Sequence, residues 1–454
     1  MTIQLTHAAP RLIEPHSPEW DAVRGTFNLL DDVNPEAIAV PKDAMEVAAA
    51  VAEAQRRGLQ VVVQATGHNA SAFGDLSGTL LVNTSKLTGV EIDAASQRVR
   101  VGAATKWEAV TPRLAELGLA GLHGSSPDVG IVGYSLGGGI GWLSRKHGMQ
   151  TNAVTAIEVV TADGRLRRVD AANDPELFWA LRGGNGNFGV VTALEFAVVP
   201  VAELWAGAMF YPVERTAEVL KAWHALLPGF PEEMTTWVSV IHFPPDPALP
   251  EFARGQSLVA VMGAFLGDQA KGAALLAPLR ELGPHVDTFA MQRTSFLGDL
   301  AMDPVEPLPY RSTTHLLSEL TPEAIDHLAR TFARGSDLAL LQLRHGGGAL
   351  SRAAQGAGAR ATLPGEVILF GLGVVTDAKA EVRVRAGLDA IDDAVFAQAV
   401  GRYPNFVERP TETRGFFDDD TWARLQRVKA AYDPEGIFRG NHPITSAGRT
   451  GPGH

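Results

Sequence analysis

Cysteine is absent from the 454-residue sequence, and its absence excludes several kinds of site. The chain can form no disulfide, no thiolate zinc or iron–sulfur site, and no thioether link to a cofactor. Its 13 histidines include no His-Glu-x-x-His pair, so we expect no metal site. Nothing in the composition requires an oxidising compartment.

Long hydrophobic runs and clusters of positive charge are missing as well. No stretch approaches the roughly 18 consecutive apolar residues of a membrane span, and residues 1–15 lack the charged start and apolar core of a signal peptide. The 39 Lys and Arg residues against 51 Asp and Glu residues give a formal net charge of −12, which repels phosphate backbones. We therefore expect a cytoplasmic protein that binds neither membranes nor nucleic acids.

Local patterns in the first part of the chain predict strands and helices in alternation. Asp43 and Gly58 bound an apolar helical pattern, as a capping residue and a helix stop. Residues 59–63 and 79–83 are predicted to be buried strands. A second capped helix is predicted over residues 105–118.

The middle of the chain has a different pattern of predicted strands and helices. Between residues 200 and 400, apolar runs alternate with longer helical patterns, which predicts a sheet backed by helices. The Ala-, Gly- and Arg-rich stretch 346–361 is predicted to be a mobile loop, and residues 448–454 are predicted to be disordered.

Glycine-rich turns are the most unusual feature that is present. They occur at residues 64–69, 133–141 and 182–192, and none matches a P-loop or the G-x-G-x-x-G fingerprint with its distant acid. In the first turn, Gly67 gives conformational freedom beside His68, so that several backbone N–H groups can converge on an anion. Taken singly, each turn is also compatible with a purely structural role.

The order of five motifs adds to this interpretation. They are NPEAIAVP (34–41), VVVQATGHN (61–69), SSPDVGIVGYSLGGGIGWLSRKHG (125–148), LFWALRGGNGNFGVVT (177–192) and RLQRVKAAYDPEGIF (424–438). This succession resembles the flavoprotein oxidases of the vanillyl-alcohol oxidase type, and within them the berberine-bridge-enzyme-like group. The resemblance covers residues 36 to about 198 and 400 to 444 at the level of motifs.

The resemblance implies an α+β fold. A two-part FAD-binding domain of the vanillyl-alcohol oxidase type would be joined to an antiparallel-sheet substrate domain backed by helices. We expect residues 1–198 to form the first part of the FAD-binding domain and residues 199–400 the substrate-binding domain. Residues 401–454 are expected to be a C-terminal segment that returns to the FAD-binding domain.

The resemblance also implies how the cofactor is held. In the family, the loop matching residues 64–69 binds the pyrophosphate of FAD through backbone amides, and the histidine matching His68 is bonded to the flavin 8-methyl carbon. Gln64 stands where the family often has Arg. Many members add a second tether through a Cys, and here Ser126 occupies that position. FAD is therefore expected to be attached through His68 only, as in 6-hydroxynicotine oxidase-like members.

Val129 matches a family position beside the reactive face of the flavin, where valine goes with access of O2; a simply packed valine is the alternative. The glycine-rich stretch 133–141 is expected to lie against the cofactor. The full set of cofactor-binding residues implied by the resemblance is Ala65, Thr66, Gly67, His68, Asn69, Ser126, Val129, Gly130, Gly133, Gly137, Gly138, Gly139, Gly141, Val191 and Asn441.

On the substrate side, Gln342 and Arg344 alternate along a predicted strand and so share a face. Some family members have an acidic general base where Arg344 aligns, but an arginine with a pKa above ~12 cannot act as one. Its planar fork suits a carboxylate or another oxygen-rich anion on the substrate, or the negative charge of a reduced flavin. An exposed strand arginine is the alternative.

The candidate bases are Tyr310, His345 and Tyr403. The tetrapeptide YPNF (403–406) resembles the family's Tyr-x-Asn-Tyr element, which reaches back to the active site. The catalytic candidates are Tyr310, Gln342, Arg344, Tyr403 and Asn405.

The resemblance implies an FAD-dependent oxidase that removes a hydride from an alcohol or amine carbon of a small molecule and reduces O2 to H2O2. Two alternatives stay open. One is a redox-neutral cyclase or isomerase that uses the flavin as a scaffold, and the other is a non-catalytic binding protein that has lost flavin. The sequence identifies neither the substrate nor the oligomeric state, and a homodimer is one option.

Overall fold

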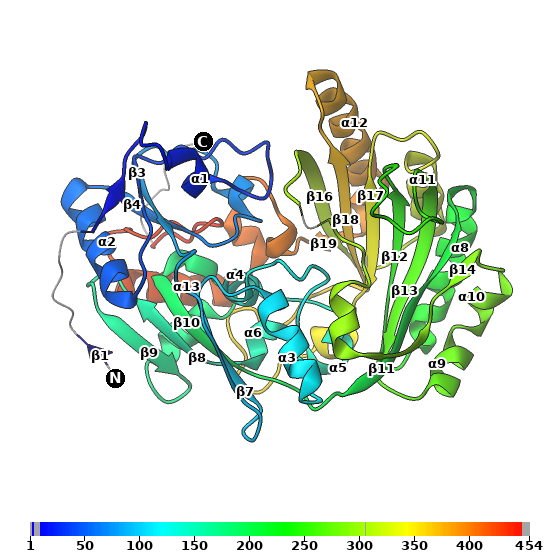
Figure 1. Ribbon diagram of the computed structural model, residues 1–454, viewed down its shortest axis with the longest axis horizontal. Helices are drawn as coiled ribbons and strands as arrows, with labels where there is room; N and C mark the ends of the chain where they lie inside the picture. The colour runs from blue at the N-terminus through cyan, green and yellow to red at the C-terminus, as the bar shows by residue number, and fades with distance from the viewer. Residues whose placement is uncertain (1, 4–9, 305, 447–454) are drawn as a thin grey trace.

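The computed structural model describes residues 2–3, 10–304 and 306–446, which form three sheets with helices around them (Figure 1). The tail predicted to be disordered, residues 448–454, lies outside the described residues. Among the described residues, no helix is both long and apolar enough to cross a membrane, and no three His, Asp or Glu side chains cluster as a metal site would require.

A four-stranded sheet near the N-terminus carries the first glycine-rich turn. Its strands, in spatial order, are β2 (Leu12–Ile13), β3 (Ala37–Ala39), β5 (Thr79–Asn83) and β4 (Gln60–Gln64). Helix α2 (Ala44–Arg57) packs on this sheet, and α1 (Trp20–Arg24) lies between β2 and β3 in the chain. Asp43 caps α2 by accepting from the Glu46 N–H, and Gly58 ends it at a φ of 70°. The predicted helix and both predicted strands are thus confirmed.

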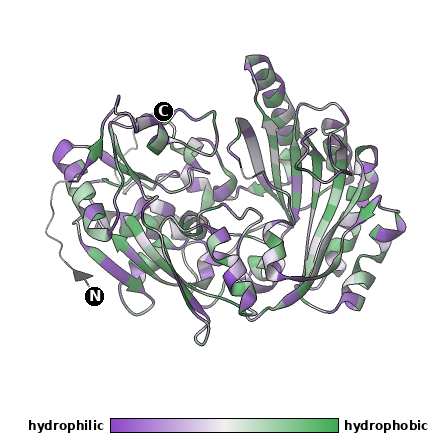
Figure 2. Ribbon diagram, viewed as in Figure 1, coloured by the Kyte–Doolittle hydropathy of each residue, from purple (hydrophilic) through white to green (hydrophobic). Residues whose placement is uncertain are grey.

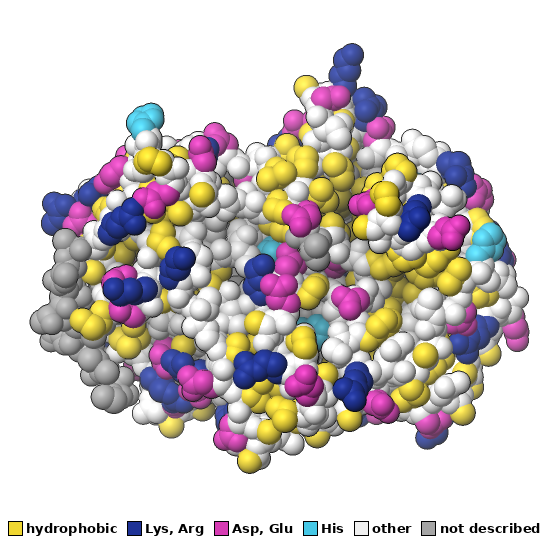
Figure 3. Space-filling model, viewed as in Figure 1, with side chains coloured by type: hydrophobic (Ala, Val, Ile, Leu, Met, Phe, Trp, Pro, Cys, Tyr) yellow, Lys and Arg dark blue, Asp and Glu magenta, His cyan; other side chains and the backbone are white. Residues whose placement is uncertain are grey.

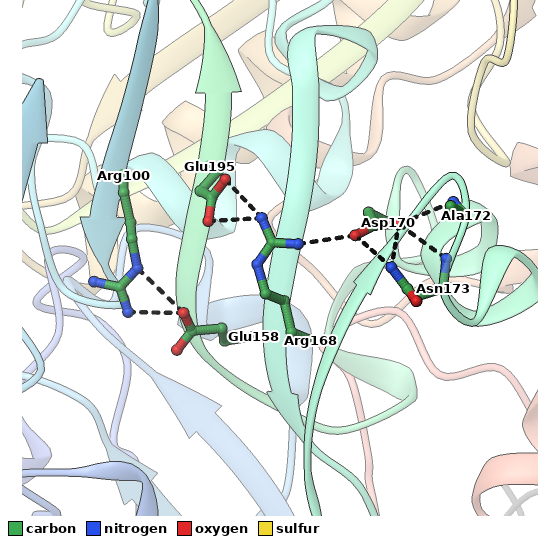
Figure 4. Close-up of polar contacts among 7 residues, drawn as sticks. All are labelled: Arg100, Glu158, Arg168, Asp170, Ala172, Asn173 and Glu195. Atoms are coloured by element: carbon green, nitrogen blue, oxygen red, sulfur yellow. Dashed lines mark hydrogen bonds and ion pairs between the residues drawn. The ribbon is translucent and has the colours of Figure 1, made fainter. Parts of the chain in front are cut away.

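A six-stranded antiparallel sheet lies beside the first. Its strands, in spatial order, are β1 (Thr2–Ile3), β9 (Leu166–Asp170), β8 (Val154–Val160), β10 (Val190–Ala197), β7 (Arg98–Gly102) and β6 (Val90–Asp93). One face carries cross-strand ion pairs, Arg100 with Glu158 at 2.8 Å and Arg168 with Glu195 at 2.9 Å (Figure 4). The alternate residues, such as Val99, form the buried core on the other face.

The chain between these sheets and the third is mostly short helices. They are α3 (Thr111–Glu116), α4 (Ile131–Gly137), α5 (Ser144–His147), α6 (Gln150–Ala153) and α7 (Pro175–Leu181). The single helix predicted over 105–118 is wrong, because a short 3-10 turn comes first and α3 starts anew with Pro112 in its first turn. The Trp107 and Glu108 N–H groups donate to Val129 and Pro127 carbonyls at 3.1 and 2.7 Å instead of continuing a helix.

A nine-stranded antiparallel sheet fills the second half of the chain, as predicted for residues 200–400. In spatial order it contains β14 (Val286–Asp287), β11 (Glu203–Pro212), β13 (Ser257–Phe265), β12 (Met234–His242), β17 (Leu340–His345), β18 (Val367–Val374), β16 (Tyr310–Leu317) and β19 (Ala399–Gly401), with β15 (Ala290–Arg293) paired to β11. Its strands are largely hydrophobic (Figure 2). Together with the sheets above, they make an α+β fold.

The helices of residues 200–400 back one face of this sheet (Figure 1). They are α8 (Thr216–Leu226), α9 (Gln269–Leu275), α10 (Ala277–Glu281), α11 (Pro322–Thr331) and α12 (Ala378–Val395). Along β17, Leu341 and Leu343 pack into the core beneath these helices, whereas Gln342 and Arg344 point to the opposite face. That free face is the one turned toward the rest of the molecule.

The stretch 346–361, predicted to be a mobile loop, packs against the rest of the protein at its two ends. Leu350 and Arg360 are buried, and Gly348 adopts a φ of 60° against the backbone of Arg145. Residues 351–356 between these contacts are exposed, and Gly356 has nothing within 4 Å of an added Cβ. The stretch is therefore a loop anchored at its ends, and its mobility stays a prediction.

The C-terminal segment returns to the N-terminal sheets. Helix α13 (Asp419–Tyr432) ends directly before Asp433 and Pro434. Buried Lys429 donates to Asp433 at 2.6 Å and to the carbonyls of Asn187 and Phe438 at 2.6 and 2.7 Å. On the face shown in Figure 3, acidic and basic side chains are intermingled, without a large patch of one sign.

Candidate active site

A cavity of about 1170 Å³ lies between the free face of the nine-stranded sheet and the glycine-rich turns. Its walls come from the loop after β4, residues 124–136, strands β12, β17 and β18, and the C-terminal residues 403–408 and 439–441. Pockets for drug-sized ligands typically measure ~300–1000 Å³. The cavity therefore has room for a large cofactor together with a small substrate.

The structure brings most of the predicted site residues together in this cavity. Every predicted catalytic residue lines it: Tyr310, Gln342, Arg344, Tyr403 and Asn405. Of the predicted cofactor-binding residues, those that line it are Ala65, Thr66, Gly67, His68, Asn69, Ser126, Val129, Gly130, Gly133, Val191 and Asn441.

Four predicted cofactor-binding glycines are not among the lining residues: Gly137, Gly138, Gly139 and Gly141. They are needed for close packing within the protein. A Cβ on Gly137 would lie 1.7 Å from Asn405 Oδ1, and one on Gly141 would lie 1.7 Å from the carbonyl oxygen of His123. Side chains and backbone of the protein fill the space beside Gly137 and Gly141, and the contact of these four glycines with the cofactor stays a prediction.

The turn after β4 presents unpaired polar groups to the cavity. Gly67 has a φ of 76°, and a Cβ there would lie 2.9 Å from Thr26 Cα. Gln64, where the family often has Arg, donates through Nε2 to the Gly25 carbonyl at 2.6 Å and so fastens the turn to the N-terminal segment. Gln64 Oε1 and His68 Nε2 are buried without an aligned hydrogen-bond partner. These features fit the dinucleotide cofactor that the sequence resemblance implies.

His68 is held on three sides. Its ring stacks on Phe27, with centroids 4.2 Å apart, and Nδ1 lies 2.8 Å from Thr66 Oγ1. Nε2 lies 3.2 Å from Asp128 Oδ2, and Ser126 Oγ donates to the other Asp128 oxygen at 2.8 Å. Burial alone would raise the pKa of Asp128, but the neighbouring His68 and Ser126 outweigh it and lower the pKa. Ser126, at the family's Cys position, therefore orients the carboxylate beside His68.

Arg344 is buried in the cavity wall, so the alternative of an exposed strand arginine is wrong. Its guanidinium lies between the rings of Trp237 and Phe406, at 4.0 and 4.7 Å from their centroids. Nε donates to Gln342 Oε1 at 2.6 Å, and Nη2 donates to Ser125 Oγ at 3.4 Å. Burial lowers the pKa of Arg344 to about 10, which leaves it charged at neutral pH.

Two of the candidate bases are engaged in structural contacts. Tyr403 Oη accepts from the Gly139 N–H at 2.7 Å and from Asn405 Nδ2 at 3.0 Å, and burial raises its pKa. His345 does not line the cavity; its Nε2 lies 2.8 Å from Arg145 Nη1, and burial lowers its pKa to about 3. Neither group is arranged to take a proton from a ligand in the cavity.

Sequence reasoning missed two acidic residues in the cavity. Glu408 accepts a hydrogen bond from the Tyr310 hydroxyl at 2.7 Å, and burial raises the pKa of Glu408 to about 7. Asp303 lines the cavity near Arg344, and burial raises its pKa. An acid two residues after the YPNF element could have been noticed, because that element was expected to reach the site, whereas Asp303 follows no pattern.

Comparisons with known proteins agree with this architecture. The family described as FAD binding domain matches residues 35–170, and the family described as berberine and berberine like matches residues 403–445. An FAD-linked oxidoreductase, aurO of Gibberella zeae, is 26% identical over 97% of this chain and 87% of its own length. The (R)-6-hydroxynicotine oxidase of Paenarthrobacter nicotinovorans is 33% identical over 40% of each chain.

Solved structures show the same fold over nearly the whole chain. The 6-hydroxy-D-nicotine oxidase of Arthrobacter nicotinovorans superposes with a TM-score of 0.84 at 23% identity, covering 96% of this chain and 97% of its own. The Physcomitrella patens BBE-like 1 protein superposes with a TM-score of 0.83 at 18% identity, covering 97% and 98%. Both family matches fall on segments that wall the cavity, so the chain carries an FAD binding domain and a berberine-like segment there, and it resembles the flavin-dependent oxidoreductases of the vanillyl-alcohol oxidase type in the berberine-bridge-enzyme-like group.

Proposed function

We propose that this protein is an oxidase that uses FAD to remove a hydride from an alcohol or amine carbon of a small molecule and reduces O2 to H2O2. The main support is that the turn at residues 64–69 and the polar side chains of β17 line the same cavity. FAD bound there would accept the hydride and pass its electrons to O2. The protein would supply binding, orientation and charge.

We further propose that FAD is attached to the protein through His68 alone. The support is the position of His68 in the cavity wall and the lack of any cysteine for a second tether. Val129, a small side chain that lines the cavity, supports the use of O2 as electron acceptor, as the family resemblance implies.

The substrate proposed here is a compact molecule with an oxygen-rich or anionic group. Arg344 supports this, since its charge is buried at the cavity wall and its donors are not saturated by an acidic hydrogen-bond partner among the described residues. Related proteins named as (R)-6-hydroxynicotine oxidase and xylooligosaccharide oxidase suggest an amine and an oligosaccharide as first probes.

The test begins with an absorbance spectrum of the purified protein, repeated on its acid-precipitated pellet and supernatant. Yellow colour in the pellet supports the covalent link, and colour in the supernatant supports FAD without it. Peroxide formation is then measured with (R)-6-hydroxynicotine, xylobiose and a panel of simple amines and alcohols, with His68→Ala as the control for attachment. A colourless protein that takes up no added FAD contradicts the proposal, and turnover without O2 use points to the redox-neutral alternative.

A further inference from the structure

Glu408 is an acidic side chain in the cavity wall to which the proposed function gives no role. It lies in the C-terminal segment, directly after the YPNF element, and lines the cavity together with Tyr310. Oε1 accepts from the Tyr310 hydroxyl at 2.7 Å, and Oε2 accepts from the Ser312 hydroxyl. Both donors stand on β16, two residues apart and therefore on one face of the strand.

The surroundings of Glu408 contain no compensating cation. Among the described residues, no Lys, Arg or His is ion-paired or hydrogen-bonded to it. Arg311, between the two donors on β16, pairs instead with Glu381 of α12 at 3.0 Å. The nearby Asp31 of the N-terminal segment is acidic as well, and it accepts from Ser71 Oγ at 2.7 Å. Burial and this like charge both favour the protonated form of Glu408, which raises its pKa to about 7.

A carboxyl in this position is suited to proton transfer. A general base works best when its pKa lies near the operating pH, and it must face the ligand. The other ionisable groups of the cavity are less suited: Arg344 stays protonated, and Tyr403 is fixed by Gly139 and Asn405. Asp303 lies within the field of Arg344, which opposes its protonation. A purely structural contact to β16 would not need a charge, and an unpaired buried carboxylate is costly.

We propose that Glu408 is the general base of the oxidation, with the hydroxyls of Tyr310 and Ser312 holding its carboxylate in place. The proposal rests on the oxidase function proposed above. As the substrate C–H leaves as a hydride, carrying both electrons to the bound FAD, the proton of the substrate O–H or N–H group passes to Glu408. A C=O or C=N bond forms. When O2 takes the two electrons, that proton and the hydrogen delivered as hydride end in H2O2, and Glu408 is again free to accept.

The kinetic test compares the FAD-loaded protein with Glu408→Gln. Bleaching of the flavin absorbance is followed after rapid anaerobic mixing with (R)-6-hydroxynicotine or xylobiose over a range of pH. In the unaltered protein we expect the rate to rise with pH through about 7 and then level off. In E408Q we expect the rate to fall roughly 10²- to 10⁴-fold and the rise to disappear. Flavin content and the rate of reoxidation by O2 should be unchanged.

Two variants separate the roles of the neighbours. Tyr310→Phe removes one donor to the carboxylate, so the midpoint of the pH profile should move upward while the rise itself remains, because this hydrogen bond favours the charged form. Asp303→Asn should leave the midpoint in place. If D303N abolishes the rise and E408Q retains it, Asp303 is the base and the proposal is overturned.

A measurement without substrate completes the test. Infrared difference spectra of the FAD-loaded protein between acidic and alkaline pH should show a protonated carboxyl band that is lost through about pH 7 and is missing in E408Q. A band that persists in E408Q, or its absence from the unaltered protein, overturns the proposal. If the flavin binds but no probe reduces it, the oxidase function fails and the assignment of Glu408 falls with it. If the probes reduce E408Q as fast as the unaltered protein, only the assignment of Glu408 fails.

Discussion

His68 has a different neighbour at each ring nitrogen, Thr66 at Nδ1 and Asp128 at Nε2. Bonding one imidazole nitrogen to FAD leaves the other nitrogen to carry or lose a proton. The Asp128 carboxylate would accept a hydrogen bond from an N–H left at Nε2 when FAD is bonded to the other nitrogen, and would so favour the proposed link. The pKa of Asp128 is lowered, so this carboxylate is ionised at neutral pH.

We therefore expect Asp128→Asn to retain FAD but to lose most of the covalent attachment. The measurement is the partition of yellow colour between acid pellet and supernatant. Ser126→Ala is the matched control, because it removes only the hydrogen bond that orients Asp128 at 2.8 Å, and it should give an intermediate partition. Full attachment in D128N would show that the carboxylate plays no part.

At this scale the sequence located the cofactor side of the site better than the catalytic side. His68 and its neighbours form a contiguous motif, so the resemblance was enough to find them. Glu408 acquires its character from Tyr310 and Ser312, nearly a hundred residues away along the chain, and from burial that only the fold creates. No local sequence pattern indicates hydrogen-bond partners so distant in the chain.

Among the elements, α4 joins the cofactor loops to the C-terminal segment. Its residue Gly137 lies against Asn405, which donates through Nδ2 to the Tyr134 carbonyl at 3.0 Å. A Cβ at Gly137 would overlap the Asn405 side chain, whereas one at Gly133 on the same helix would meet nothing within 4 Å. The two glycines differ in packing although the sequence pattern does not distinguish them.

Gly137→Ala should consequently destabilise the protein by about 1–3 kcal/mol, as expected for overpacking. Chemical denaturation followed by tryptophan fluorescence measures the change. Gly133→Ala is the control, and we expect it to leave the unfolding midpoint nearly unchanged or slightly higher, since alanine favours a helix. Equal losses of stability in both variants would mean that backbone freedom, rather than the contact with Asn405, is what α4 requires.

Element prediction succeeded where signals were local and failed where distant backbone competed. Helix α2 has its cap and its stop within its own sequence, Asp43 and Gly58, and it formed as predicted. Residues 105–118 carry a similar signature, but the carbonyls of Val129 and Pro127 take the N–H groups of Trp107 and Glu108. Tertiary hydrogen bonds thus override a capping pattern that is otherwise sound.

For the molecule as a whole, buried histidines tie stability to pH. Burial lowers the pKa of both His123 and His442 to about 4, from an ordinary value of 6.5. The unfolded chain therefore binds these protons more tightly than the folded one. Their contribution to stability is complete above pH 6.5 and is lost as the pH falls toward 4, by about 1.4 kcal/mol per pH unit for each histidine.

From these two histidines we expect the free energy of unfolding to decline as the pH falls from about 6.5 to 4, whereas Glu408, with its raised pKa, opposes the decline. Denaturant titrations at several pH values measure it. His442→Gln can still donate to the Pro404 carbonyl, which His442 Nε2 approaches to 2.9 Å, but cannot titrate. In H442Q the free energy of unfolding should depend less steeply on pH, because one titrating group is removed. An unchanged dependence would mean that other groups cause the acid sensitivity.

A buried arginine joins α5 to the nine-stranded sheet and its flanking loops. Arg145 of α5 donates to the Met234 carbonyl at 2.8 Å, to the Phe230 carbonyl at 3.2 Å and to the Gly346 carbonyl, all of which belong to the nine-stranded sheet and its flanking loops. Burial lowers the pKa of Arg145 to about 10, but it stays charged at neutral pH. Charged hydrogen bonds of this kind contribute about 1.5–3 kcal/mol each, and removing the donor leaves buried carbonyls unpaired.

Arg145→Met should therefore lower the unfolding free energy by about 3 kcal/mol or more, because methionine replaces the aliphatic stem but donates no hydrogen bond to these carbonyls. Since the hydrogen bonds of Arg145 join the cofactor turns to the sheet that carries Gln342 and Arg344, the same variant should also weaken FAD retention before global unfolding.

Lys146→Met is the matched control, since the exposed Lys146 pairs with Glu233 on the surface at 2.7 Å and its replacement should leave both readouts nearly unchanged. Denaturation followed in parallel by flavin release and by tryptophan fluorescence distinguishes the cases. If R145M unfolds with both signals unchanged, the contact of α5 with the sheet depends on apolar packing, such as that of Trp142 on Trp237 with ring centroids 3.5 Å apart, and not on the arginine.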